Sequence, residues 1–371
     1  MAESPALVAA RDLAATFAER EIVDGEAYPA RNIAELHDAG VIRSPFPAAL
    51  GGSGATLVDG ARIVETLAAA SPSTALIMSM PLGLAAAYAR AGEVVPDEHR
   101  ALWQKQVEAA AAEFRAGRLY AACNSEKGAG GSLKDIKTVA VQNGSTYRLS
   151  GEKILASSGR YADYFFSTAK VDAGTEAEHV ELFVVRTDAP GVDVKSDWDG
   201  FGMRSTESHS VHYRDAAAEH MLGWPNFIDE TQSLLYWFCL FAAVPLGCAK
   251  SILETLSAPA PMSPAVRLRL VDARMQYESL AAYLAETAAM WRPGANKAVA
   301  LRVLRTKTYV TQEATRLCAG LFALSGGRHY TRTGRLGRAL ADSFAGTALR
   351  PPLPLALDML VAQFEATGPD G

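Results

Sequence analysis

The apolar residues in the first third of the chain recur with the spacing of a helix. Leu7, Ala10 and Leu13 lie three residues apart, which places them on one helical face. Alanine and leucine, both strong helix formers, are frequent in this stretch. The pattern predicts a helical domain over residues 1–118, interrupted by a loop at 43–54 that contains two prolines and three glycines.

Beyond this stretch the pattern changes to short runs of β-branched and aromatic residues separated by turn residues. Asn143-Gly-Ser and Ser150-Gly-Glu are typical of hairpin connections. The alternation predicts a small β barrel or sandwich as the middle domain, over residues 119–223. We expect its strands at residues 138–141, 147–149, 164–168, 180–185 and 210–213.

The helical period returns after residue 223 and continues to the end of the chain. It predicts a C-terminal helical domain over residues 224–371, with helices at 234–252, 266–291, 297–324 and 353–364. Helices, then strands, then helices, kept in separate blocks, indicate an α+β fold.

Composition narrows the classes of partner. The chain has 371 residues, of which 49% are hydrophobic and 21% charged, so it has the composition of a globular protein. Its net charge of −5 argues against a broad basic face for nucleic acid. Small molecules and other protein subunits are the expected partners.

The cysteines and the N-terminal residues favour a cytoplasmic location for the protein. Four cysteines lie far apart with no CxxC spacing, which indicates reduced structural thiols rather than disulfides. The N-terminal residues lack the basic and apolar regions of a secretory signal. The apolar run at 234–248 is shorter than the roughly 20 residues that span a bilayer, so we expect a buried helix and no membrane contact. No spacing of histidines, cysteines or acids predicts a metal site.

A glycine-rich stretch opens the middle domain. It reads Cys123-Asn-Ser-Glu-Lys-Gly-Ala-Gly-Gly-Ser132. Glycine occurs where φ is positive or where another group approaches the main chain closely. A flat cofactor or a phosphate would satisfy the second condition, whereas an ordinary surface turn would satisfy the first.

The order of several short motifs resembles the acyl-CoA dehydrogenase superfamily along nearly the whole chain. The family's loop Thr-Glu-Pro-Gly-Ala-Gly-Ser-Asp and the strand motifs after it can be laid without gaps on residues 123–171. The matching segments are Ser125-Glu-Lys-Gly-Ala-Gly-Gly-Ser132, Ser150-Gly-Glu-Lys153, Leu155-Ala-Ser-Ser-Gly159 and Gly200-Phe-Gly-Met-Arg-Ser-Thr206.

The resemblance implies a helical N-terminal domain, a β-barrel domain and a C-terminal four-helix bundle, with a flavin between the last two. It implies that Ser125 and Ser157 lie at the polar edge of the flavin ring. Leu155 stands where the family usually has an aromatic residue over one ring face, so apolar cover remains without stacking. The flavin-binding residues expected are Asn124, Ser125, Gly130, Gly131, Leu155 and Ser157.

The chain departs from the family at the catalytic base. Acyl-CoA dehydrogenases remove the α-proton of a thioester with a glutamate, and that position falls on Arg350, which stays protonated and cannot act as a base. An alternative register places Ala345 there, and the second place where the family carries this glutamate reads Trp237. We expect Trp237, Phe238 and Leu349 to line the substrate pocket beside Arg350.

A second departure concerns the cofactor. The family segment that holds the adenine half of FAD from a neighbouring subunit has no counterpart, and about ten residues are missing between Gly247 and Asp272. FMN, or reduced flavin supplied by a flavin reductase, is therefore as consistent with the sequence as FAD.

Three functions remain open at this point. The first is a flavin-dependent dehydrogenase for an acyl thioester or a related small molecule, and the second is a reduced-flavin monooxygenase of the same superfamily, in which Arg350 orients an anionic substrate or stabilises an activated oxygen. The third is a non-catalytic subunit that completes a partner's site. In each case the resemblance implies a homo-oligomer, either a dimer or a tetramer.

Overall fold

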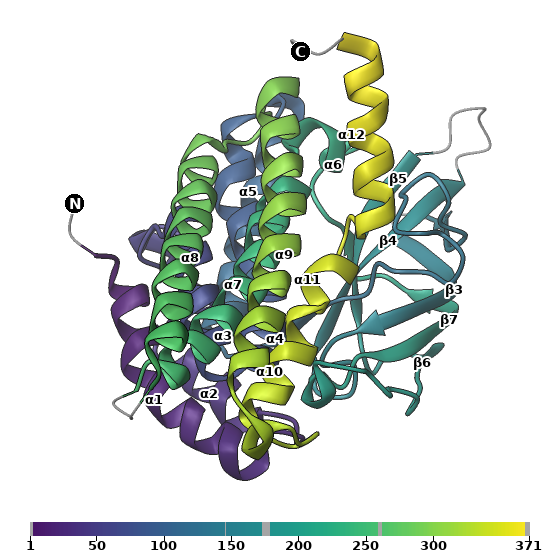
Figure 1. Cartoon of the computed structure of the whole chain (residues 1–371). Coiled ribbons are helices and arrows are strands. Elements are labelled where there is room, and N and C mark those ends of the chain that lie inside the picture. The colour runs from purple at the N-terminus through teal and green to yellow at the C-terminus, as the bar shows by residue number, and fades with distance from the viewer. Residues whose placement is uncertain (1–2, 145, 173–178, 259–261, 368–371) are drawn as a thin grey trace.

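The computed structural model describes residues 3–144, 146–172, 179–258 and 262–367 of the chain. Helices occupy one side of the molecule and a curved sheet the other, as Figure 1 shows. The first helical block contains α1 (Pro5–Asp24), α2 (Ala30–Asp38), α3 (Leu57–Ala70), α4 (Pro72–Arg90) and α5 (Arg100–Arg115).

Polar caps define where these helices begin. The Ser4 hydroxyl accepts a hydrogen bond from the Leu7 N–H at the start of α1. Thr56 and Asp59 form a reciprocal capping box at the start of α3. The predicted loop at 43–54 precedes this cap and contains a single short 3₁₀ turn, Ala48–Leu50.

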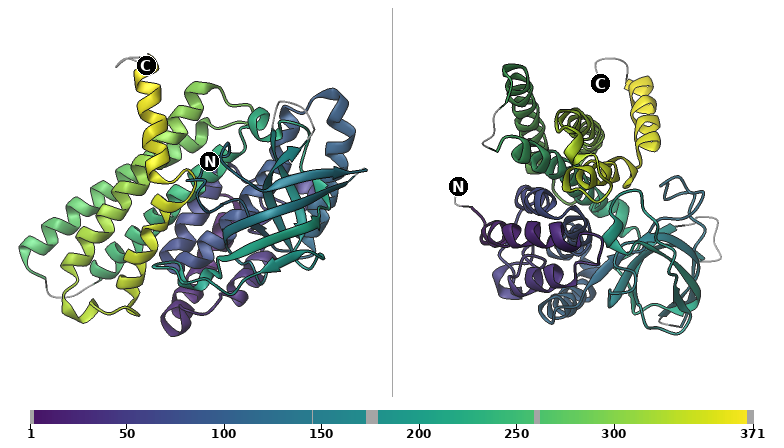
Figure 2. Two further views of the ribbon diagram at one scale, coloured as in Figure 1. Left: turned by 90° about the vertical axis from the view of Figure 1, so that its right-hand side faces the viewer. Right: turned by 60° about the horizontal axis from the view of Figure 1, so that its bottom comes forward.

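The middle block forms one sheet of eight strands. In space the strands follow the order β6-β7-β3-β2-β4-β5-β8, with β1 paired to β4. Figure 2 shows the sheet curled on itself beside the N-terminal helices. The strands are β1 (Tyr120–Ala122), β2 (Val139–Asn143), β3 (Thr146–Ala156), β4 (Tyr164–Asp172), β5 (His179–Arg186), β6 (Val192–Val194), β7 (His209–Ala217) and β8 (His220–Met221).

The curl brings the two ends of the sheet together after β7. The Ala218 N–H donates to the Tyr147 carbonyl of β3, and the next N–H, of Glu219, donates to Val184 of β5. Among the described residues, however, β6 and β8 do not pair, so the ladders form a curled sheet rather than a closed ring. The predicted middle β domain is confirmed, and its sheet has the curvature of a barrel.

The C-terminal block consists of helices that pack on both other blocks. Helix α7 is buried along most of its length between α9 and the N-terminal α3. It is the one described helix with the length and composition of a membrane span, but most of it is buried inside the protein, as expected of a core helix. The helices are α6 (Phe227–Thr231), α7 (Leu234–Leu256), α8 (Pro264–Met290), α9 (Lys297–Leu324), α10 (Arg335–Ser343), α11 (Ala345–Ala348) and α12 (Leu353–Thr367).

The order of helical, sheet and helical blocks confirms the predicted α+β class. Helix α5 ends at Arg115 and β1 begins at Tyr120, while β8 ends at Met221 and α6 begins at Phe227. The proposed domain limits after residues 118 and 223 fall in these connections and remain predictions. All four cysteines are buried and unpaired.

Candidate functional site

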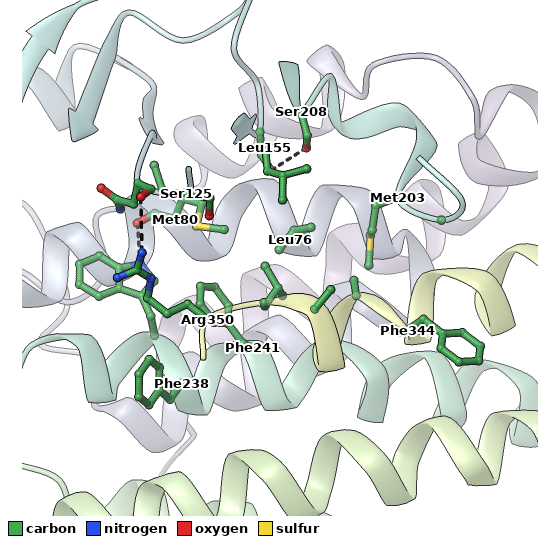
Figure 3. A pocket seen from close by; sticks show the side chains of 18 of the residues that line it. Leu76, Met80, Ser125, Leu155, Met203, Ser208, Phe238, Phe241, Phe344 and Arg350 are labelled. Carbon is green, nitrogen blue, oxygen red and sulfur yellow. Dashed lines mark hydrogen bonds between the residues drawn. The ribbon is translucent and has the colours of Figure 1, made fainter. Parts of the chain in front are cut away.

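A largely apolar cavity of about 290 Å³ lies where the sheet meets the helices. Its walls come from α4, the end of β1 and the loop after it, the end of β3, strands β4 and β5, the loop before β7, the start of α7, and the segment from α10 to Arg350. In Figure 3 the strands lie above the cavity, and Arg350 and Phe344 mark its two ends. The site is therefore assembled from all three blocks of the chain.

Most of the residues predicted from the sequence meet at this cavity. The lining includes Asn124, Ser125, Leu155, Ser157, Trp237, Phe238, Leu349 and Arg350. These residues come from segments that lie far apart in the sequence, so their convergence supports a single functional site. The roles proposed for them remain predictions.

Gly130 and Gly131 do not line the cavity. Both have positive φ, +57° and +86°, and a Cβ at Gly131 would lie 2.4 Å from Cδ of Pro352. The close approach that requires glycine at position 131 is therefore to the chain itself. The expectation that these two glycines contact a flavin ring remains a prediction.

The three positions that could correspond to the family base all face the cavity. They are Arg350, Ala345 and Trp237. The Trp237 ring fills the space beside Gly83, where an added Cβ would lie 2.2 Å from the indole nitrogen, and its N–H donates to the Met80 carbonyl at 3.2 Å. Among the described residues that line the cavity, none is a carboxylate or a histidine.

Arg350 is the one charged side chain in the described lining. Its Nη2 donates a long hydrogen bond of 3.4 Å to the Asn124 carbonyl. Burial lowers the pKa of Arg350 to about 10, partly opposed by the more distant Glu126 carboxylate, so the guanidinium remains charged at neutral pH. Among the described residues, this guanidinium has one hydrogen-bond acceptor, so most of its five donors remain available to an anion in the cavity.

Lys307 of α9 holds the segment that carries Arg350. Its Nζ donates to the carbonyls of Leu349, at 2.8 Å, and Pro351, at 2.6 Å. The side chain is buried, and burial lowers the pKa of Lys307 to about 7. Because these carbonyls flank Arg350 in the chain, Lys307 fixes the backbone from which the guanidinium extends.

Leu155 has two unusual features for a large apolar residue. Its φ is +60°, in the left-handed region that leucine rarely adopts. Its side chain is also 50% exposed, although it lines an apolar cavity, and Figure 3 shows it reaching in from the sheet side. A strained backbone that presents an apolar side chain to an open cavity is suited to covering a flat ligand.

A buried ion pair connects the glycine-rich loop to β3. Lys153 Nζ lies 2.7 Å from Glu126 Oε1 and 2.6 Å from the Thr168 carbonyl, and both charged side chains are buried. Glu126 also accepts the N–H groups of Lys137 and Thr138. Burial raises the pKa of Glu126, but Lys153 and these donors more than offset it, so the net shift is downward and the carboxylate stays charged.

The position of this ion pair matters because it is adjacent to the site. Glu126 follows Ser125, and Lys153 precedes Leu155 by two residues. The pair thus fixes two cavity residues, one from the loop after β1 and one from β3. Both residues belong to motifs that the sequence analysis identified. However, they lie 27 residues apart in the chain, and no local signal predicts that their side chains form an ion pair.

Asp342 connects α10 to the loop on the opposite wall. Its Oδ1 accepts the Met203 N–H at 2.5 Å, and Met203 lines the cavity. Burial raises the pKa of Asp342 to about 7. The folded protein therefore holds a proton on Asp342 at pH values where the unfolded chain has released it.

This difference predicts how stability changes with pH. The contribution of Asp342 is fully present below about pH 4 and is lost as the pH rises through 7, by at most about 1.4 kcal/mol per pH unit. Asp342→Asn keeps an acceptor for Met203 and should flatten the fall in unfolding free energy between pH 5 and 7, measured by urea denaturation. Burial also raises the pKa of Glu181 to about 7. Glu181→Gln should therefore reduce the dependence of unfolding free energy on pH further, independently of Asp342. If the unfolding free energy of Asp342→Asn falls between pH 5 and 7 as steeply as that of the unaltered protein, Asp342 does not contribute to this pH dependence.

Several cavity residues were not predicted from the sequence. Leu76 and Met80 come from α4, which is buried on all sides, so no apolar stripe indicates which side faces the cavity. Ser208 lies two residues beyond the Gly200–Thr206 motif and could have been found by extending that match. Among the described residues, no three potential metal ligands cluster here or elsewhere.

The residues present fit a flavin ring. Such a ring needs apolar cover on its faces and a few fixed polar groups along its edge. Leu155 and the walls of α4 and α7 supply the apolar cover, and the Ser125 and Ser157 hydroxyls supply polar groups on the sheet side. The exposed, strained Leu155 is the observation that favours a flat ligand most directly.

Comparison with known proteins gives two family matches. Residues 4–94 match the profile "Acyl-CoA dehydrogenase, N-terminal domain", and residues 121–216 match "Acyl-CoA dehydrogenase, middle domain". Together they cover half of the chain. A curated relative, "Probable acyl-CoA dehydrogenase YngJ" of Bacillus subtilis (strain 168), is 26% identical over 358 residues, covering 90% of this chain and 91% of that protein.

Two solved structures share the fold over almost the entire length. KijD3, solved with FMN and dTDP-3-amino-2,3,6-trideoxy-4-keto-3-methyl-D-glucose, has a TM-score of 0.84 and 21% identity, covering 100% of this chain and 98% of that chain. FMN-bound TdsC of Paenibacillus sp. A11-2, a dibenzothiophene monooxygenase, has a TM-score of 0.82 and 20% identity, covering 97% and 96%. At these identities the likeness establishes the fold.

Proposed function

The chain belongs to the acyl-CoA dehydrogenase superfamily, and we propose that it is a flavin-dependent monooxygenase that uses reduced flavin and oxygen. The observation that carries this proposal is the lining of the cavity, which contains one guanidinium and, among the described residues, no carboxylate or histidine. Dehydrogenation of a thioester requires a group that removes the α-proton. Oxygen transfer does not require that group.

Similarity to these relatives does not distinguish oxygen transfer from dehydrogenation. YngJ is named as a dehydrogenase, whereas TdsC is named as a monooxygenase and KijD3 was solved with FMN. All share the fold, and fold alone does not determine chemistry. The choice therefore depends on the side chains in this cavity.

The residues that line the cavity each have a physical role in this proposal. Leu155 covers one face of the ring, and Ser125 and Ser157 bind its polar edge. When reduced and bound, the flavin supplies the electrons with which oxygen is activated. The apolar walls exclude water, which strengthens polar interactions inside the cavity and limits the loss of activated oxygen to solvent.

The side chains at the end of the cavity near Arg350 indicate the class of substrate. Trp237, Phe238 and Phe241 present aromatic surfaces there, and Arg350 presents a cation with most donors free. This combination suits a small molecule with an aromatic or cyclic body and an anionic group. We propose FMN rather than FAD as cofactor and a separate flavin reductase as partner, because the sequence lacks the segment that holds the adenine half in the family.

Dehydrogenation of an acyl thioester is the second candidate. It is favoured by YngJ, whose similarity extends over 90% of this chain. In that case Arg350 would bind an anionic part of the thioester, and the proton would have to leave to a group outside the described lining. A non-catalytic subunit that completes a partner's site in a hetero-oligomeric dehydrogenase is the third.

One experiment separates these candidates. The protein is mixed anaerobically with reduced FMN, then with isotopically labelled oxygen and a panel of aromatic carboxylates, and the products are analysed by mass spectrometry. We expect one labelled oxygen atom in a product. Flavin binding without labelled product across the panel would support the dehydrogenase instead, if an acyl-CoA added anaerobically to a separate sample reduces bound oxidised FMN. Absence of flavin binding would support the non-catalytic role.

A further inference from the structure

A chain of three hydroxyl groups runs from the cavity into the loop before β7. Ser157 Oγ lies 2.9 Å from Ser208 Oγ, which lies 2.6 Å from Thr206 Oγ1. The Thr206 hydroxyl donates to the Met203 carbonyl at 2.8 Å. All three hydroxyl side chains are buried, and Ser157 and Ser208 line the cavity. Figure 3 shows Ser208 and a dashed line for its bond to Ser157.

The carbonyl at the inner end fixes the direction of this chain. A carbonyl oxygen can only accept, and each hydroxyl has one proton to donate. Because Thr206 donates to Met203, Ser208 must donate to Thr206. Ser157 must then donate to Ser208. The Ser157 oxygen therefore offers a lone pair, not a proton, to whatever occupies the cavity.

We propose that Thr206 and Ser208 are positioning residues that make Ser157 a hydrogen-bond acceptor, so that the cavity prefers reduced flavin to oxidised flavin. The flavin ring nitrogen that takes up a proton on reduction is a donor when reduced and a bare acceptor when oxidised. Only the reduced form therefore matches the lone pair of Ser157. This inference rests on the proposed function, because it takes the ligand to be a flavin.

The preference is modest because the chain can reverse. Ser157 can donate to an acceptor in the cavity if the chain gives up one of its hydrogen bonds. If all three hydroxyls turn, the bond lost is the one from Thr206 to the Met203 carbonyl. That carbonyl keeps two other donors, the Thr206 N–H at 3.1 Å and the Trp198 indole N–H at 3.2 Å. The reversal costs about one neutral hydrogen bond, which corresponds to a preference of about fivefold.

Thr206→Val tests the inference because it keeps the side-chain shape and removes the hydroxyl. Ser208 is then free to donate to Ser157, and Ser157 to donate to a ligand. The ratio of the Kd for oxidised FMN to the Kd for reduced FMN, measured anaerobically, should fall about fivefold. The midpoint potential of bound FMN should fall by about 20 mV, which is the same ratio converted for two electrons.

Two further variants make the test specific. Ser208→Ala breaks the chain at its middle and should change the ratio in the same direction, whereas Thr206→Ser retains the hydroxyl and should leave the ratio unchanged. If FMN binds all four proteins with the same ratio, the inference is overturned while the proposed flavin site stands. If none of them binds FMN in either redox state, the proposed function fails and the inference with it.

Discussion

Lys153→Met is expected to lower the free energy of unfolding by about 3–5 kcal/mol, because it leaves the buried Glu126 carboxylate without its cation. Lys153 and Glu126 are both buried and lie 2.7 Å apart. The N–H donors of Lys137 and Thr138 remain, but they do not neutralise the charge. Urea denaturation of the purified variant measures the loss.

The double variant Glu126→Gln with Lys153→Met is the matched control. It removes both charges and keeps an acceptor for the two backbone N–H groups, so it should recover most of the lost stability. A double variant as unstable as the sum of the two single variants would contradict this account.

Since the pair fixes Ser125 and Leu155, we also expect Lys153→Met to weaken FMN binding when the folded variant is titrated.

Arg350→Met is expected to abolish the preference of the cavity for anions. Benzoate and benzamide form a matched pair of probes that differ mainly in charge. In the presence of saturating FMN, the Kd for benzoate should rise by roughly 10- to 150-fold, because a hydrogen bond to a charged group contributes about 1.5–3 kcal/mol. Benzamide should be much less affected. Isothermal titration calorimetry measures both.

Two other variants identify the part of Arg350 that matters. Arg350→Lys keeps the charge but loses the planar pair of donors, so it should recover only part of the benzoate affinity. Lys307→Met leaves Arg350 in place but removes the donor to the Leu349 and Pro351 carbonyls, and it should weaken benzoate more than benzamide. Equal losses for both probes in Arg350→Met would show that Arg350 acts by packing and not by charge.

The sequence predicted those features that depend on local spacing. The period of apolar residues located the long helices α7, α8, α9 and α12, and turn residues located the strands. The motifs at 123–132 and 155–159, through their resemblance to the family, predicted that Ser125, Leu155 and Ser157 lie at one site, and all three line the cavity. A short motif keeps its residues close wherever the fold places them.

Features that depend on contacts between distant segments could not be predicted. Lys307 lies more than 40 residues before the carbonyls it binds, within a helix whose pattern gives no sign of them. The direction of the Ser157–Ser208–Thr206 chain depends on the Met203 carbonyl, which lies in the loop before β7 and more than 40 residues from Ser157. The close approach of Pro352 to Gly131 also joins distant segments, and no local signal predicts it.

The central claim is that this cavity binds a flavin but has no group that removes an α-proton. The most direct measurement is the visible absorbance of the FMN-loaded protein, recorded anaerobically while saturated acyl-CoA thioesters of increasing chain length are added. We predict that the absorbance of oxidised FMN persists with every thioester. Bleaching of the bound FMN by any of them would contradict the claim, because it would require a base at a cavity where Arg350, Ala345 and Trp237 occupy the expected positions.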